Sequence, residues 1–142
     1  NKAGEALGKI KGVHAMTDVT GFGLAGHLTE MMEGSKLTAK LSYAKIPIIP
    51  EVRNYIAQKA IPGATARNWS ATREGIELAK SIDELEASLI LPDPQTNGGL
   101  LIAVDPNSVL EVQALLKAAG IMYTEPIGIC TAASNKKIVI TA

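Results

Sequence analysis

The sequence is poor in several residues on which whole classes of function depend. It has a single cysteine, Cys130, so no intramolecular disulfide can form, which fits a reducing cytoplasm. Lysine plus arginine and aspartate plus glutamate both number 14, so no net charge attracts nucleic acid or an anionic membrane. No apolar run approaches the roughly 18 residues of a membrane span, and no signal peptide is visible. We therefore expect a cytoplasmic protein that binds neither nucleic acid nor membrane.

Common catalytic signatures are missing as well. No glycine loop ends in Gly-Lys-Ser/Thr, and no local pattern signals a Ser/His/Asp set or a Cys/His pair. His14 and His27 do not have a recognised metal-ligand spacing, which favours partly buried hydrogen-bonding roles. Cys130 lies near the end of a predicted strand without a neighbouring base, so we expect an inert core thiol. Trp69 is interpreted as a packing residue.

The length of 142 residues suits one domain with a single core. The sequence begins at Asn1 rather than at Met, and residues 1–10 have the apolar spacing of the end of a helix. We therefore expect residues 1–142 to be one domain of a longer protein. Strands and helices follow one another without a regular βαβ alternation, which indicates an α+β fold or a three-layer α/β/α arrangement.

Residues 14–27, His-Ala-Met-Thr-Asp-Val-Thr-Gly-Phe-Gly-Leu-Ala-Gly-His, read as a strand, a glycine turn and a helix that ends near Gly34. The apolar face of this helix consists of Leu24, Leu28, Met31 and Met32. Such a turn directs backbone N–H groups and the positive end of the helix dipole at one point, where an anion is stabilised. A carboxylate beside an anion suits a divalent cation between them, so Asp18 is the predicted metal ligand.

Residues 21–26 also match the Gly-x-Gly-x-x-Gly pattern of dinucleotide-binding folds. That interpretation requires an apolar first strand and an acidic residue about 20 residues later. The strand here carries Thr17, Asp18 and Thr20, and residues 41–45 contain no acid. We therefore reject the dinucleotide fold.

Hydrophobic periodicity and turn residues predict the remaining elements. Strands are expected at residues 37–42, 88–91, 100–104, 122–129 and 137–141, the last as an edge strand with two lysines. Helices are expected at residues 50–60 and at residues 109–120, the second capped by residues 105–108. Residues 63–72 read as irregular, residues 74–86 as a helix or a mobile excursion, and residues 93–99 as a turn-rich loop.

Threonines flank the predicted metal ligand. Thr17 and Thr20 are placed to orient the Asp18 carboxylate or to contact a phosphate, although threonine also has high strand propensity. Asp18 itself has the alternative role of a turn or cap residue. A single carboxylate rarely holds Mg²⁺ alone, so we expect this chain to supply only part of a phosphate and metal site.

Two loops add further candidates. Arg67 and Asn68 suit phosphate recognition through a planar guanidinium and an amide, with a solvated loop as the alternative. Asn97 and Gly98 suit a backbone nest for an anion, with a plain turn before a strand as the alternative.

These motifs together resemble the selenide, water dikinase (selenophosphate synthetase) family. Residues 14–27 match its signature, and the resemblance continues through Pro-Gly-Ala-Thr-Ala-Arg-Asn at 62–68 and Asp-Pro-Gln-Thr-Asn-Gly-Gly-Leu-Leu at 93–101. The match covers nearly the whole chain as the C-terminal domain of that two-domain enzyme. Membership of the aminoimidazole ribonucleotide synthetase-like superfamily implies a three-layer α/β/α fold whose mixed sheet is partly ferredoxin-like.

The resemblance also implies a reaction. ATP, selenide and water would give selenophosphate, AMP and phosphate, with Mg²⁺ as cofactor and the full-length enzyme as a homodimer. Asp18 would join acids of the absent N-terminal domain in holding Mg²⁺ on ATP. The catalytic cysteine or selenocysteine and its lysine would also lie in that absent part, so we expect no catalytic residue here and an inactive fragment. The nucleotide contacts implied are Thr17, Thr20, Gly21, Arg67, Asn68, Asn97 and Gly98.

Some positions depart from the family pattern, and other functions stay open. Met16 stands where Cys is frequent, Asn97 where Ser is common, and Ala64 where a second Gly is usual, which leaves the shape of the last two loops open. The alternatives are another enzyme of the superfamily, such as thiamine-monophosphate kinase, a hydrogenase maturation factor or the purine enzyme itself, or a non-catalytic nucleotide-binding module.

Overall fold

Helices and strands alternate irregularly along the chain, and the computed structural model describes all residues from Asn1 to Ala142. The helices are α1 (Gly4–Leu7), α2 (Gly23–Ser35), α3 (Val52–Ala57), α4 (Thr65–Thr72), α5 (Glu84–Ile90) and α6 (Val109–Ala118). The strands are β1 (Val13–Asp18), β2 (Leu37–Ser42), β3 (Ile76–Leu78), β4 (Leu100–Val104), β5 (Gly128–Ala132) and β6 (Ile138–Thr141). Short 3-10 turns are η1 (Tyr43–Lys45), η2 (Arg73–Gly75) and η3 (Pro106–Ser108).

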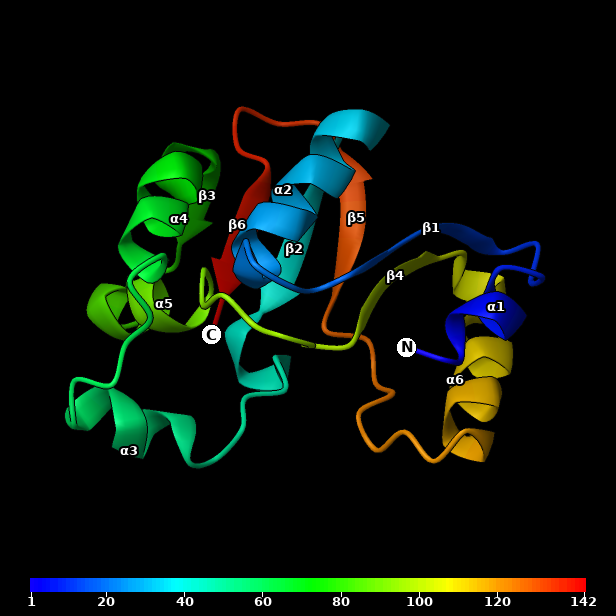
Figure 1. Cartoon of the computed structure of the whole chain (residues 1–142). Coiled ribbons are helices and arrows are strands. Elements are labelled where there is room, and N and C mark those ends of the chain that lie inside the picture. Colours follow the sequence, from blue (N-terminus) through cyan, green and yellow to red (C-terminus); the bar gives the residue numbers. More distant parts are fainter.

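The strands form two separate sheets. β1 and β4 make a two-stranded antiparallel ribbon, and the other four strands make a sheet in the order β3-β6-β2-β5. This larger sheet is mixed, because β2 runs antiparallel to β5 and parallel to β6, which is also parallel to β3. Helices α4 and α5 lie on one side of the strands and α1 and α6 on the other (Figure 1). The expected combination of α+β elements, a mixed sheet and α/β/α layers is confirmed.

Each sheet has its own apolar core. The larger core joins α2 to the four-stranded sheet and to α5, through Ala25, Leu28, Met32, Ala39, Leu41, Ile76, Ala87, Leu91, Ile138 and Ile140. The smaller core joins α1 to α6 through Leu7, Ile10, Val112 and Leu116, with the ribbon packed against it. The chain crosses from the smaller core to the larger one where β1 ends and α2 begins.

The register of the ribbon decides where Asp18 lies. Asp18 is opposite Leu100 and Thr17 is opposite Leu101. The pairing is regular from Ala15 to Asp18, and its one irregularity falls between Val13 and Ala15. Because β1 ends and β4 begins at the same end of the ribbon, the glycine turn and the loop before β4 leave it together.

Two sequence-based interpretations of the central segment are wrong. Residues 65–72, expected to be irregular, form α4, which has no side-chain cap and packs against α2 and α5. Residues 88–91, expected to be a strand, belong mostly to α5, because Asp83 caps that helix by accepting hydrogen bonds from the N–H groups of Leu85 (2.8 Å) and Glu86 (3.3 Å). The ambiguous residues before it form η2, β3 and the start of α5.

Several element ends also differ from expectation. Lys36, with φ of 55°, takes the left-handed position that ends α2, two residues after the expected Gly34. α3 is shorter than expected and has no buried residue. In the last part of the chain β5 starts only at Gly128, and β6 lies inside the sheet between β3 and β2 rather than at an edge. Strands β2 and β4 have the expected bounds, and α6 ends before Gly120, whose φ is 77°.

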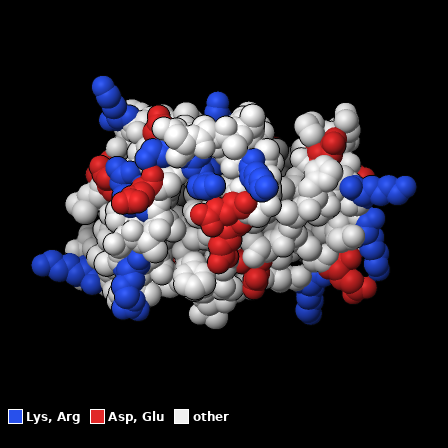
Figure 2. Space-filling view, turned by 90° about the horizontal axis from the view of Figure 1, so that it is seen from above, with Lys and Arg blue, Asp and Glu red and all other residues white.

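The surface carries charges of both signs. Figure 2 shows acidic and basic side chains spread over one face of the molecule, with neither sign covering the face alone. Any attraction of phosphate on that face therefore comes from local groups rather than from a broad field. The longest helix has 13 residues, and no helix combines the length and the apolar character that crossing a membrane requires.

Candidate functional site

The glycine turn after β1 and the loop before β4 are hydrogen-bonded to each other. We call residues 19–23 and 91–99 the paired loops. The N–H of Val19 donates to the carbonyl of Gly99 at 2.9 Å, and the N–H of Gly98 donates back to the carbonyl of Val19 at 2.8 Å. These bonds extend the ribbon by one step beyond Asp18 and bring two of the predicted site motifs into one place.

Two more bonds tie the paired loops together at the start of α2. The N–H of Gln95 donates to the carbonyl of Thr20 at 3.1 Å. The N–H of Ala25, in the first turn of α2, donates to the carbonyl of Leu91 at 2.9 Å. The carbonyl of Leu91 therefore occupies one of the helix N–H groups that were predicted to bind an anion. The N–H groups of Gly21, Phe22 and Leu24 make no hydrogen bond within the chain and remain as donors.

Gly23 explains why this turn needs glycine. Its φ is +68°, a left-handed conformation that side chains with a Cβ rarely adopt. A Cβ built there would lie 2.5 Å from the carbonyl carbon of Pro92 and 2.8 Å from the nitrogen of Asp93. Backbone therefore lies directly against backbone where α2 meets the second of the paired loops.

Asp18 stands at the edge of this unit with its side chain exposed. No side-chain hydrogen bond or ion pair ties up its carboxylate, and the neighbouring Thr17 hydroxyl is directed to the carbonyl of Asp18 at 3.3 Å. No cluster of three or more His, Cys, Asp or Glu side chains able to hold a metal occurs in the chain. Asp18 thus offers one free oxygen-donor group, and its role as a metal ligand stays a prediction.

Thr20 is held from the helix side by a buried histidine. His27 is 9% exposed, and its Nε2 lies 3.3 Å from the Thr20 hydroxyl. Its ring also lies 5.7 Å from the ring of Phe22, between centroids. The hydrogen-bonding role expected for His27 is confirmed, whereas His14 is largely exposed and lies 3.9 Å from Asp105 at the other end of the ribbon.

Asn68 reaches the paired loops from α4. Its Nδ2 donates to the carbonyl of Gly21 at 2.8 Å and to the carbonyl of Pro92 at 3.0 Å. The preceding Arg67 is exposed and makes no ion pair or hydrogen bond within the chain. The structure therefore brings Asn68 into the unit and leaves the Arg67 guanidinium free at the surface of α4.

The second loop uses some of its predicted donors internally. The Asn97 side chain accepts a hydrogen bond from the N–H of Gly99 at 3.1 Å, an Asx-type turn. Gly98 has its N–H on Val19, and a Cβ added to it would lie 2.6 Å from Oε1 of Gln95. The N–H groups of Thr96 and Asn97 make no hydrogen bond within the chain. The loop's free donors therefore lie just before Gly98 rather than at it.

Asp93 is a site neighbour with little signal in the sequence. Burial raises the pKa of its carboxyl, and no side chain donates to it. Its N–H lies against Gly23, so it belongs to the paired loops. Its only sequence signal is its place at the start of the matched motif at residues 93–101. Likewise, Cys130 was expected in the core but is exposed on β5, with the pKa of its thiol raised by partial burial.

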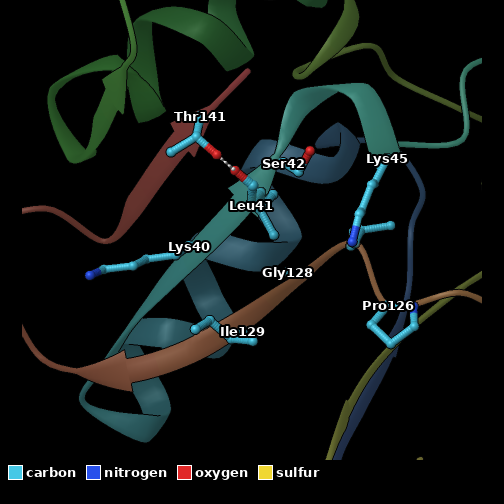
Figure 3. Close-up of a pocket in the computed structure, with 9 residues that line it drawn as sticks. Lys40, Leu41, Ser42, Lys45, Pro126, Gly128, Ile129 and Thr141 are labelled. Atoms are coloured by element: carbon cyan, nitrogen blue, oxygen red, sulfur yellow. Dashed lines mark hydrogen bonds between the residues drawn. The ribbon is translucent and has the colours of Figure 1, made fainter.

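Two hollows accompany these features. A mostly apolar cleft of about 880 Å³ between the ribbon and the larger sheet includes Val19, Asp93, Gln95 and Gly98 in its lining. A smaller pocket of about 260 Å³ lies at the ends of β2, β5 and β6, and in Figure 3 its two lysines, Lys40 and Lys45, point in different directions. None of the predicted site residues lines this smaller pocket, so we do not assign the site to it.

Comparison with known proteins places these features in a family context. The family model described as AIR synthase related protein, C-terminal domain, matches residues 2–141. Selenide, water dikinase of Shewanella sp. (strain ANA-3) is 50% identical over 127 residues, which are 89% of this chain and 34% of that protein. The protein of the same name from Yersinia pestis is 44% identical over 140 residues, 99% of this chain and 39% of its own length. The protein of that name from Dechloromonas aromatica (strain RCB) is 42% identical over 128 residues, which are 90% of this chain and 36% of that protein. The chain thus spans little more than a third of these curated relatives.

Proposed function

The chain belongs to the family of AIR synthase related C-terminal domains, and we propose that it is the C-terminal domain of a selenide, water dikinase. In this proposal the complete protein converts ATP, selenide and water into selenophosphate, AMP and phosphate. The observation that carries it is the unit formed by the paired loops, which combines the free carboxylate of Asp18 with unpaired backbone N–H groups. The names and the 42–50% identity of the three relatives support the choice within the family.

Mg²⁺ is the cofactor that we propose for this site. The groups beside the paired loops are hard oxygen donors, namely the Asp18 carboxylate and the hydroxyls of Thr17 and Thr20, which are the ligand types that Mg²⁺ prefers. One carboxylate does not complete an octahedral shell, so phosphate oxygens, water and acids from another domain would supply the remainder. When bound, Mg²⁺ neutralises charge that develops on the transferred phosphoryl groups.

The chain's own residues would act mainly by binding and orienting the nucleotide. The N–H groups of Gly21 and Asn97 and the free guanidinium of Arg67 are the proposed phosphate donors. Gly98, a predicted contact whose N–H is bonded to Val19, would shape the loops through that hydrogen bond. No residue of the chain is proposed as the nucleophile, and Cys130, which is on β5, is not given that role.

The proposal includes partners. The complete protein would carry an N-terminal domain that supplies the other metal-binding acids and the catalytic residues, and it would act in the cytoplasm as a homodimer. The relatives are two to three times as long as this chain, which supports a further domain. The present chain alone would then be inactive.

The test compares Asp18→Asn with Glu111→Gln in the complete product of the gene. Asn keeps the size of the side chain and removes its charge, and Glu111 is an exposed acid on α6 without a hydrogen bond or ion pair. We expect AMP formation from ATP to require selenide, and Asp18→Asn to lower kcat/KM for ATP about 100-fold. Glu111→Gln should behave like wild type. Raising the Mg²⁺ concentration should recover part of the loss.

Different outcomes separate the alternatives. Undiminished turnover by Asp18→Asn would refute the metal role of Asp18. ATP turnover that does not respond to selenide would favour another enzyme of the superfamily. ATP binding without turnover under any condition would favour a nucleotide-binding module.

A further inference from the structure

One side chain of α4 holds both of the paired loops at once. Nδ2 of Asn68 donates to the carbonyl of Gly21 in the first loop and to the carbonyl of Pro92 in the second, at 2.8 and 3.0 Å. Neither carbonyl accepts a hydrogen bond from any other group of the chain. The two loops are distant in sequence from Asn68 and meet it only through the packing of α4 against α2 and α5.

The chemistry of an amide suits this task. An amide nitrogen carries two hydrogens that point in different directions, so one side chain can satisfy two carbonyls without adding charge. A carboxylate of nearly the same shape has no hydrogen to donate when ionised, and one of its acceptor oxygens would face two acceptor carbonyls. Asn68 with both hydrogens engaged is also a poor phosphate donor, because only its acceptor oxygen remains free.

We propose that Asn68 is a positioning residue, which fixes the distance between the paired loops and so sets the shape of the Mg²⁺–ATP site, rather than a ligand of the nucleotide. This inference rests on the function proposed above for the use of the site, whereas the fastening of the loops is a property of the chain alone. Two neighbouring residues of the matched motif at residues 62–68 thus have different roles. Asn68 holds the paired loops together, whereas the Arg67 side chain remains free.

Hydrogen exchange on the present chain tests the fastening directly. The reporters are the amide of Gln95, which donates to Thr20 in the first loop, and the amide of Ala25, which donates from α2 to Leu91 in the second. The internal reference is the amide of Ala39, which donates to Lys137 in the larger sheet. We expect Asn68→Ala to speed exchange of the two reporters about tenfold and Asn68→Asp to speed it further, with no change at Ala39. Ser70→Ala, an exposed position on the same helix, is the matched control and should leave all three amides unchanged.

The decisive result is which of the two variants, Asn68→Ala or Asn68→Asp, shows the faster amide exchange. If Asn68 served only to fill space, the isosteric Asn68→Asp would be milder than Asn68→Ala, and that order would overturn the proposal. Unchanged exchange of both reporters in Asn68→Asp would overturn it as well. In the complete protein, KM for ATP should rise in the order wild type, Asn68→Ala, Asn68→Asp.

The exchange assay tests whether Asn68 holds the loops together, and the enzyme assay tests whether the loops shape a nucleotide site. Faster exchange with an unaltered KM for ATP would show that the loops are fastened by Asn68 but do not shape a nucleotide site. That result would overturn the positioning role of Asn68. Turnover by Asp18→Asn, measured beside it, decides the proposed function independently.

Discussion

Gly23→Ala is a substitution for which the structure predicts a large effect from a single methyl group. Gly23 has φ of +68°, and its Cα faces the backbone of the second paired loop. The new Cβ would lie 2.5 Å from the carbonyl carbon of Pro92, 2.8 Å from the nitrogen of Asp93 and 2.8 Å from the carbonyl oxygen of Leu91. Since all three atoms belong to the backbone, no side-chain rotation can relieve the contact.

The cost has two parts. The left-handed conformation is less favourable by about 1–2 kcal/mol for a residue with a Cβ than for glycine. Forcing a methyl group into packed surroundings adds about 1–3 kcal/mol, because backbone has to shift. Together the free energy of unfolding should fall by about 2–5 kcal/mol, and the melting temperature by at least about 6 °C for a domain of this size.

Thermal and urea unfolding of the purified chain, followed by circular dichroism, measure the effect. The matched control is Gly34→Ala in the last turn of the same helix, where an added Cβ meets nothing within 4 Å and φ is not positive. That variant should be neutral or more stable by up to about 1 kcal/mol, because alanine favours helix more than glycine does. A Gly23→Ala chain as stable as the Gly34→Ala chain would refute the argument from backbone contact.

Two further predictions concern carboxylates and pH. Glu86 accepts hydrogen bonds from Arg53 (2.9 Å) and Tyr43 (3.1 Å), and these bonds lower the pKa of its carboxyl. The ionised Glu86 therefore stabilises the fold at pH values above the unfolded-state pKa of about 4.3. This stabilisation is lost as the pH falls through the folded-state pKa. Because the Arg53–Glu86 pair is partly exposed, Glu86→Gln should lower the free energy of unfolding by about 1 kcal/mol or less at pH 7. In acid, the variant and the wild type should have the same melting temperature. A difference that stays constant at all pH values would contradict this account. Burial raises the pKa of Asp93 instead, so its ionisation opposes folding above the folded-state pKa and has no effect below the unfolded-state value of about 3.9. Asp93→Asn should raise the melting temperature at pH 7 and match wild type below about pH 4, and a lower melting temperature at pH 7 would show that the carboxylate has a stabilising partner.

The sequence predicts those elements whose signals are local. Strand β2 alternates apolar and polar residues. Helix α6 follows the turn η3, which Asp105 caps and Pro106 begins, and Gly120 comes after its end. Helix α4 has no comparable signal, since residues 65–72 are rich in Thr, Asn and Ser and lack a cap. It forms because Trp69 packs against the larger core and Arg73 lies 5.6 Å above the Trp69 ring.

In the candidate site, too, the sequence predicts the local features and not the contacts between distant segments. The position of Asp18 at a strand end, beside a glycine turn, follows from the sequence pattern, and its exposure is seen only in the structure. The internal use of Gly98 and Asn68 does not, because their partners, Val19 and Gly21, are contributed by distant parts of the chain. Helix α5 is a third case: the sequence contains the Asp83–Glu86 capping pattern, but the short apolar run after it also fits a strand.

The irregular pairing near the start of β1 bears on how this domain can change in length during evolution. Two residues of β1, Val13 and His14, occupy the space of one residue opposite Val104, so the strand absorbs one extra residue there. A deletion before Ala15 could therefore be accommodated by regularising the strand. A deletion between Ala15 and Asp18 would turn the following side chains to the opposite face and move Asp18 away from the paired loops. Insertions and deletions among homologous domains should therefore collect before Ala15 and be missing from the short segment that leads to the glycine turn.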